Sequence, residues 1–183
     1  MPWQNGGGTT REFFREPSGE LPVEWRLSVA EVTSDGPFSI FPGVDRILVL
    51  LAGEGMTLAS SEWSVRVDVP LRCVEFPGDL AIEATLVSGA TLDLNLMWSR
   101  DAWRATSVVR VGPLDMVMGG TGEVHVAYVA EGSVHVDGTL LRRGEAAVWT
   151  SAVSLHGDVS IALFTLTPLR DRPPVQPVSS VSA

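Results

Sequence analysis

The chain has 183 residues, of which 45% are hydrophobic, so it can bury a substantial core in one domain or in two small fused modules. The formal charge is −9 and all 13 basic residues are arginines, which excludes lysine Schiff-base chemistry. Nucleic acid is not an expected partner, because its binding depends mainly on neutralising phosphates and the chain carries no large basic cluster.

Neither a membrane span nor an internal disulfide is expected. The longest aliphatic run, Ile47 to Ala52, is far shorter than the roughly 20 residues that cross a bilayer. Cys73 is the single cysteine and fits a reducing compartment. We therefore expect a cytoplasmic protein with no membrane partner.

The first unusual stretch runs from Trp3 to Glu12 and contains three consecutive glycines. Glycines admit positive φ and let other groups approach the backbone closely. Trp3 can anchor the segment, and Asn5, Thr9 and Thr10 supply donors and acceptors around backbone N–H groups. This combination suits a small polar or anionic ligand. The alternatives are a turn capped by these side chains and an unfolded terminus.

The rest of the chain has a pattern typical of short strands, broken by Gly, Pro, Asp and Ser, without a long helical period. The fold class is therefore all-β. The segment Trp98–Thr106 is predicted as a helical turn or a loop between two halves. The predicted strands are Arg11–Arg15, Val23–Ala30, Asp45–Leu51, Met56–Ala59, Ser64–Val69, Leu71–Phe76, Ala81–Val87, Thr91–Met97, Ser107–Val111, Glu123–Val129, Ser133–Val136, Glu145–Trp149 and Ser160–Thr167, with a short segment Phe38–Phe41.

Several predicted strands carry polar side chains on one face. In the alternating strand Val23–Ala30, such a face either lines a pocket or meets solvent. Arg46 either binds a ligand or forms a structural salt bridge, and Asp45 either contacts the ligand or orients Arg46. Phe38 and Phe41 are core candidates, or one of them forms an apolar pocket wall. The candidate ligand-binding residues are Asn5, Thr9, Thr10, Arg26, Ser28, Asp45, Arg46, Asn95 and Met97.

An internal repeat relates the two halves of the chain. The order of apolar strand, glycine, strand, Gly-acid pair and strand begins at Arg46 and is repeated from His125. This order resembles the cupin unit, a small antiparallel jelly-roll barrel, present twice. We predict an N-terminal module at 1–104 with its glycine-rich opening, a degenerate C-terminal module at 105–170, and a disordered Pro- and Ser-rich tail at 171–183.

The ligand pattern of metal-binding cupins is largely missing. A His-x-His pair and a following Glu are needed, but no histidine precedes His125, and Arg46 lies where the first module would place the Glu. An arginine there would repel a cation and would favour a carboxylate ligand through charge-assisted hydrogen bonds. We therefore expect neither a metal nor another cofactor.

Five segments of the first hundred residues form a distinctive series: Pro2–Glu12, Glu24–Ser28, Gly36–Arg46, Phe76–Asp79 and Asp93–Met97. In this order they resemble the HutD/Ves family. The resemblance implies a bacterial cytoplasmic bicupin, with two fused RmlC-like barrels. It also implies a role in histidine utilisation, through sensing or limiting an intermediate such as urocanate or N-formylglutamate.

Two features depart from the family. Gln4 stands where the family usually has Lys, and members usually begin with a further strand before the tryptophan.

The favoured function is therefore non-catalytic binding of a small carboxylate metabolite. The alternative is a cupin-type isomerase or hydrolase that uses His125 or His156 as a base, with Glu131 as a further ligand if the enzyme depends on a metal. A third interpretation is a homodimer formed through an exposed barrel edge.

Overall fold

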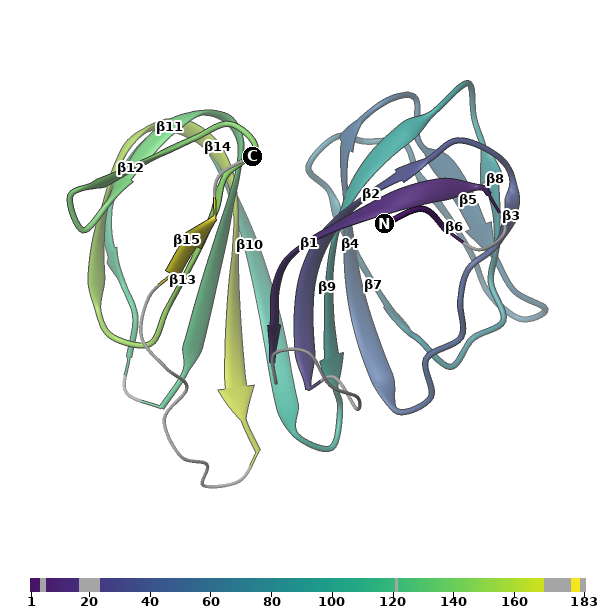
Figure 1. Ribbon diagram of the computed structural model, residues 1–183, viewed down its shortest axis with the longest axis horizontal. Coiled ribbons are helices and arrows are strands. Elements are labelled where there is room, and N and C mark those ends of the chain that lie inside the picture. The colour runs from purple at the N-terminus through teal and green to yellow at the C-terminus, as the bar shows by residue number, and fades with distance from the viewer. Residues whose placement is uncertain (4–5, 17–23, 121, 170–178, 182–183) are drawn as a thin grey trace. The chain divides into compact units, whose positions relative to one another are not determined.

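A computed structural model of the chain describes residues 1–3, 6–16, 24–120, 122–169 and 179–181 (Figure 1). Every regular element among these residues is a β-strand, so the all-β prediction is confirmed. Contacts divide the chain into two compact units, Met1–Asp101 and Ala102–Ala183.

The first unit consists of two antiparallel sheets that face each other across an apolar core. The five-stranded sheet has the order β1 (Gly8–Glu16), β2 (Trp25–Val32), β9 (Thr91–Ser99), β4 (Val44–Ala52) and β7 (Cys73–Pro77). The four-stranded sheet has the order β3 (Gly36–Pro37), β8 (Glu83–Leu86), β5 (Met56–Ala59) and β6 (Ser64–Val67). Leu48 and Leu50 of the first sheet pack in one cluster with Met56 and Leu58 of the second.

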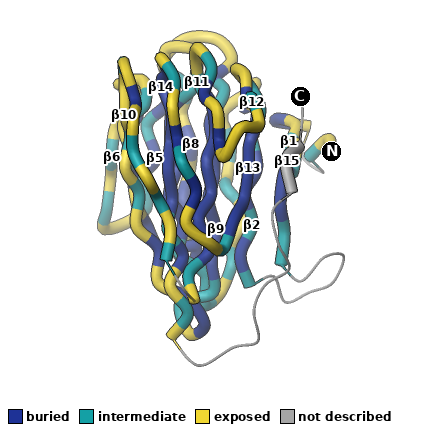
Figure 2. Tube along the Cα trace, turned by 90° about the vertical axis from the view of Figure 1, so that its left-hand side faces the viewer, coloured by how far each residue is buried: buried dark blue, intermediate teal, exposed yellow. Residues whose placement is uncertain are grey.

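The second unit consists of one antiparallel sheet of six strands among the described residues. Its order is β10 (Trp103–Met118), β14 (Val153–Pro168), β11 (Val124–Val136), β13 (Ala146–Trp149) and β15 (Ser179–Val181), and β12 (Thr139–Arg142) also pairs with β11. Its core gathers around Trp149, Leu155 and Ile161, which are fully buried. Figure 2 shows the same distribution along both units, with buried strand centres and exposed turns.

The strands β10, β11 and β14 extend well beyond the ranges predicted from the sequence. β10 continues through Pro113, which is tolerated because β10 pairs only with β14 among the described strands. β11 continues through Gly132 beside a bulge, where φ is 75° and a Cβ would lie 2.3 Å from the carbonyl oxygen of Asp158. β14 likewise begins at Val153 and includes Gly157.

The structure also differs from the sequence prediction in two segments that connect strands and in the C-terminal tail. Trp98–Thr106 is mostly strand, because β9 runs to Ser99 and β10 begins at Trp103. Phe38–Phe41 contains no strand and follows the short β3. In the tail predicted to be disordered, Ser179–Val181 pair with β13, and residues 171–178 and 182–183 lie outside the described part.

In the described part of the chain, the structure contains no helix that is long and apolar enough to cross a lipid bilayer. Cys73 is half-buried and forms no disulfide among the described residues.

Candidate functional site

The amino-terminal residues fold back on β1 and form one wall of a cavity. The Trp3 backbone N–H donates to the Gly8 carbonyl at 2.9 Å, and the Thr10 N–H donates to the Met1 carbonyl at 2.8 Å. The indole Nε1 of Trp3 donates to the Thr10 hydroxyl at 2.7 Å. A Cβ at Gly8 would lie 2.3 Å from the carbonyl oxygen of Glu31, so only glycine lets β1 approach β2 here.

The cavity lies in the first unit and has a volume of about 660 Å³. Its lining combines an aromatic and aliphatic wall with a small number of polar side chains, the usual composition of a small-molecule site. The lining residues are Met1, Pro2, Trp3, Thr10, Arg26, Ser28, Ala30, Pro37, Phe38, Ser39, Phe41, Arg46, Asp93 and Asn95.

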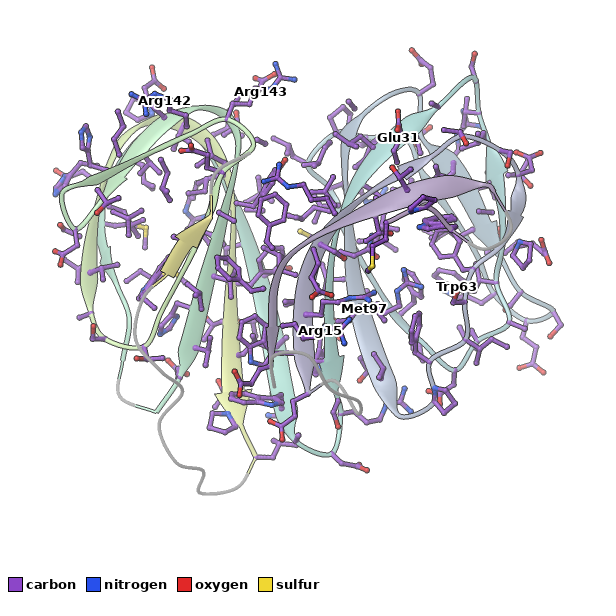
Figure 3. The ribbon with its side chains drawn as sticks, in the orientation of Figure 1. Arg15, Glu31, Trp63, Met97, Arg142 and Arg143 are labelled. Atoms are coloured by element: carbon purple, nitrogen blue, oxygen red, sulfur yellow. The ribbon has the colours of Figure 1, made fainter. Side chains whose placement is uncertain are left out.

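Strand register brings the polar residues together. Arg26 on β2 and Arg46 on β4 both pair with Met97 on the central strand β9, and Ser28 pairs with Asn95 one step along. Because side chains alternate, these residues share the face that turns toward the four-stranded sheet. Met97 is labelled in Figure 3, where its side chain projects from β9 into the space between the two sheets.

Arg46 is the most deeply placed cation of the pocket, with an exposed fraction of only 7%. Its carbon Cζ lies 5.0 Å from the ring centroid of Phe38, 5.9 Å from that of Phe41 and 5.1 Å from that of Phe76. Burial lowers the pKa of Arg46 to about 10, so the guanidinium remains charged at neutral pH. Its Nη2 donates to Asn95 Oδ1 at 2.8 Å, but Nε has no hydrogen-bond partner among the described residues.

Asn95 connects Arg46 to a buried carboxyl group. Arginine can only donate, so its contact directs the Asn95 oxygen toward Arg46 and the Asn95 amide nitrogen toward Asp93 Oδ1, to which it donates. Asp93 is fully buried, and its Oδ2 has no hydrogen-bond partner in the described part. Burial raises the pKa of Asp93 to about 7, against the lowering effects of Arg46 and Asn95.

Arg26 is the second cation of the pocket. Its Nη2 lies 3.0 Å from the sulfur of Met97, and its Cζ lies 5.8 Å from the ring centroid of Phe41. Burial lowers the pKa of Arg26, and Nε again has no partner among the described residues. Each of the two guanidinium groups of the pocket therefore has a buried Nε–H without a hydrogen-bond partner among the described residues.

The predicted site residues are only partly brought together. Thr10, Arg26, Ser28, Arg46 and Asn95 line the cavity. In contrast, Thr9 is exposed, Met97 contacts Arg26 without lining the cavity, and Asn5 lies outside the described residues, as does Gln4.

Asp45 is used elsewhere in the fold. It accepts hydrogen bonds from Arg100 at 2.8 and 3.1 Å, and Arg100 also contacts Asp79. The shared cation reduces the repulsion between the two carboxylates, and Asp79 accepts a backbone hydrogen bond from Gly43 at 2.9 Å. This cluster holds the Gly43 turn, and Asp45 does not line the pocket.

We therefore expect Asp45→Asn to leave ligand affinity unchanged within about twofold. The substitution removes one partly exposed ion pair, which contributes about 0–1 kcal/mol, and leaves the cavity wall intact. Calorimetric titration of the variant and of the wild type with ligand measures the affinities. A tenfold loss of affinity would show that Asp45 belongs to the binding site.

Parts of the pocket wall were not predicted from the sequence. Asp93 shares the polar face with Asn95 at the i, i+2 spacing, which was the available signal. Phe38 and Phe41 both line the cavity, a role the sequence suggested for one of them, and Phe38 also packs against the core cluster as the core interpretation expected. Trp3 was expected only as an anchor.

The histidines of the alternative enzyme hypothesis do not converge. His125 is buried in the second unit, stacks on Trp149 with 6.0 Å between ring centroids, and lies 3.1 Å from the Thr165 hydroxyl. His156 is exposed and pairs with Asp115 at 2.9 Å, opposite His135 in the strand register. Within the described ranges, no three His, Cys, Asp or Glu side chains are grouped as metal ligands.

Comparison with known proteins identifies the family. The HutD family model matches residues 1–163. This chain belongs to the HutD family. The chain is also similar to the protein Ves of Citrobacter koseri. The two are 33% identical over 148 residues, and the match covers 80% of this chain and 76% of that protein.

A second relative matches over a shorter length. An uncharacterised 21.2 kDa protein from the hutC 3′ region of Pseudomonas putida is 38% identical over 106 residues, 57% of this chain. The match spans only 56% of the length of that relative.

Solved structures agree with the family assignment. HutD from Pseudomonas fluorescens, determined in a formate condition, has a TM-score of 0.81 and 28% identity, covering 92% of each chain. A cupin 2 conserved barrel domain protein from Leptotrichia buccalis has a TM-score of 0.55 at 10% identity, covering 87% of this chain and 88% of that chain. The fold of this HutD-family chain is thus cupin-like.

Proposed function

We propose that the chain is a non-catalytic binding protein for a small carboxylate metabolite. The observation that carries this proposal is Arg46, a buried guanidinium that forms no ion pair with a carboxylate among the described residues and faces a cavity of about 660 Å³. Buried charges in proteins are normally paired, because desolvation without a partner is costly. A ligand carboxylate supplies the missing partner.

The unused donors specify the geometry of the ligand. A buried donor without a partner costs about 1–3 kcal/mol, and the Nε atoms of Arg26 and Arg46 are two such donors. A carboxylate between the two guanidinium groups accepts from both, through charge-assisted hydrogen bonds. Phe38, Phe41 and Trp3 provide an apolar surface for the remainder of the molecule.

The family context supports the choice of metabolite. A relative is described by its place in the hutC 3′ region, and a HutD structure with a TM-score of 0.81 was determined in a formate condition. We infer a cytoplasmic regulator of histidine utilisation that binds a metabolite similar to urocanate or N-formylglutamate. We also infer that its two units are two fused cupin barrels, since each has antiparallel strands around its own core.

The proposal predicts stabilisation by ligand in the absence of metal. At a ligand concentration 100 times Kd, binding stabilises the folded state by about 2.7 kcal/mol, which raises Tm by about 5–10 °C in a protein of this size. Thermal unfolding with urocanate, N-formyl-L-glutamate or formate, in buffer containing EDTA, measures the shift.

Two matched controls isolate the carboxylate. Imidazole keeps the ring of urocanate without its carboxylate, and formamide replaces formate with a neutral molecule of similar size. Neither is expected to shift Tm. If all three carboxylates leave Tm unchanged at millimolar concentration, or if imidazole and formamide shift it equally, the proposed function is wrong.

A further inference from the structure

The pocket contains an acidic side chain in a place built to receive an anion. Asp93 lines the same cavity as Arg26 and Arg46, has no exposed surface, and leaves Oδ2 without a hydrogen-bond partner among the described residues. A carboxylate ligand at the two arginines would introduce a second negative charge close to Asp93. Two carboxylates that share one site raise each other's pKa, so one of them takes up a proton more readily.

We propose that Asp93 contacts the ligand in its protonated form, so that the pocket takes up a carboxylate together with one proton. This inference rests on the proposed function and adds a specificity-determining residue to it. The proton comes from solvent and resides on Oδ2, which donates a hydrogen bond to the carboxylate of the ligand. No covalent bond within the ligand forms or breaks.

The neighbouring hydrogen bonds determine which oxygen carries the proton. Oδ1 already accepts from the amide of Asn95, and Asn95 is held in this orientation by Arg46. Oδ2 is the remaining atom, and a protonated Oδ2 becomes a donor while Oδ1 keeps its acceptor role. The free protein is poised for this step, because burial raises the pKa of Asp93 to about 7.

Among the groups around Asp93, the Arg46 cation lowers its pKa, whereas burial raises it and a bound carboxylate would raise it further. The charged lining side chains in the described part are Arg46 on β4, Arg26 on β2 and Asp93 itself. On β1, Glu12 is paired with Arg15 at 2.8 Å, and the Met1 ammonium contacts the Thr10 carbonyl.

The remaining elements of the first unit contribute no competing charge within the described residues. On β7, Glu75 alternates with the inward Phe76 and therefore projects to the opposite face of the sheet. On the four-stranded sheet, Glu83 is exposed, and Arg66 is paired with Asp68 at 2.6 Å. A bound carboxylate therefore acts on Asp93 directly, and protonation of Asp93 removes the repulsion between the two.

Affinity measured against pH tests the proposal. N-formyl-L-glutamate and formate are suitable probes, because their carboxyl groups are fully ionised between pH 6 and pH 9. We expect Kd to be constant below pH 7 and to rise about tenfold per pH unit above it, as one-proton linkage requires. Calorimetry at pH 8 in HEPES and in Tris, which have different ionisation enthalpies, should show uptake of up to one proton per ligand.

Asp93→Asn is the matched variant, because asparagine keeps the shape and the acceptor for Asn95 but cannot titrate. It should bind with a Kd that does not change between pH 6 and pH 9, and more tightly than the wild type at pH 9. Asp45→Asn, which lies outside the pocket, should keep the wild-type slope.

Stability without ligand provides a second readout. The folded-state pKa of Asp93 lies above its unfolded value, so the contribution of Asp93 to stability falls as pH rises from about 4 to about 7 and is constant above that. Asp93→Asn should lack this loss, so that the difference between its Tm and that of the wild type grows across that range and is then constant.

The outcomes separate this inference from the proposed function. If the wild type binds the probes with a Kd that is independent of pH, the proton uptake is wrong and the binding function stands. A pH slope retained in Asp93→Asn also overturns the role of Asp93. If the wild type binds neither probe at any pH, both proposals fail.

Discussion

Replacing Arg46 by leucine should reduce carboxylate affinity at least 100-fold while leaving the protein folded. Charge-assisted hydrogen bonds contribute about 1.5–3 kcal/mol each, and the loss of two removes about 3 kcal/mol or more of binding free energy. Leucine suits the site that remains, because Phe38, Phe41 and Phe76 surround the guanidinium with aromatic rings.

The same substitution should leave Tm of the free protein unchanged or higher. A buried unpaired cation carries a desolvation cost, and apolar replacements of buried charges are often neutral or stabilising. Asp93 loses the charge that lowers its pKa, so it becomes protonated at neutral pH and adds no unpaired anion. Calorimetric titration and thermal unfolding at pH 6.5 measure the two effects.

Arg66→Leu is the matched control, since Arg66 lies in the same unit but is exposed and paired with Asp68. It should bind ligand as the wild type does. An Arg46→Leu protein that is folded by circular dichroism and still binds the carboxylate would contradict the proposed site.

Gly8→Ala should destabilise the first unit by about 2–3 kcal/mol, within the range of strongly destabilising single substitutions. The added Cβ would lie 2.3 Å from the Glu31 carbonyl oxygen and 3.1 Å from the Trp3 ring, so β1 must move away from β2. Because Trp3 and Met1 line the cavity, ligand affinity should fall as well. Urea unfolding followed by circular dichroism, and titration with ligand, measure both.

Gly89→Ala is the comparison for this prediction. Gly89 has φ of 63°, and a Cβ added there would have no atom within 4 Å, so alanine costs about 1–2 kcal/mol in backbone strain without displacing a strand. Equal losses in the two variants, or unchanged ligand affinity in Gly8→Ala, would show that the opening segment does not shape the pocket.

The fold class and much of the candidate site could be predicted because both depend on local patterns. Alternation placed Arg26 with Ser28, and Asn95 with Met97, on shared faces. Alternation alone does not say which face turns inward. Polar faces usually meet solvent, and here the five-stranded sheet turns one toward the cavity.

Partners that are distant in sequence could not be predicted. Asp45 pairs with Arg100, 55 residues away, and nothing local to Asp45 indicates this choice. The predicted strand Ser107–Val111 ended before Pro113, whereas β10 continues through this residue as a strand that pairs only with β14 among the described strands. Asp93 was visible in the pattern, but its missing hydrogen-bond partner appears only in three dimensions.

The alternation of polar and apolar residues along β9 fixes its register in the sheet. Along this strand Asp93 and Asn95 alternate with Leu94 and Leu96, so a shift of one residue against β2 and β4 would exchange the two sets. The misaligned form would carry a carboxylate and an amide among the leucines of the opposite face and would leave the arginines facing aliphatic chains. Its energetic penalty disfavours it during folding, so the residues that recognise the anion also select the correct alignment of the strand that holds them.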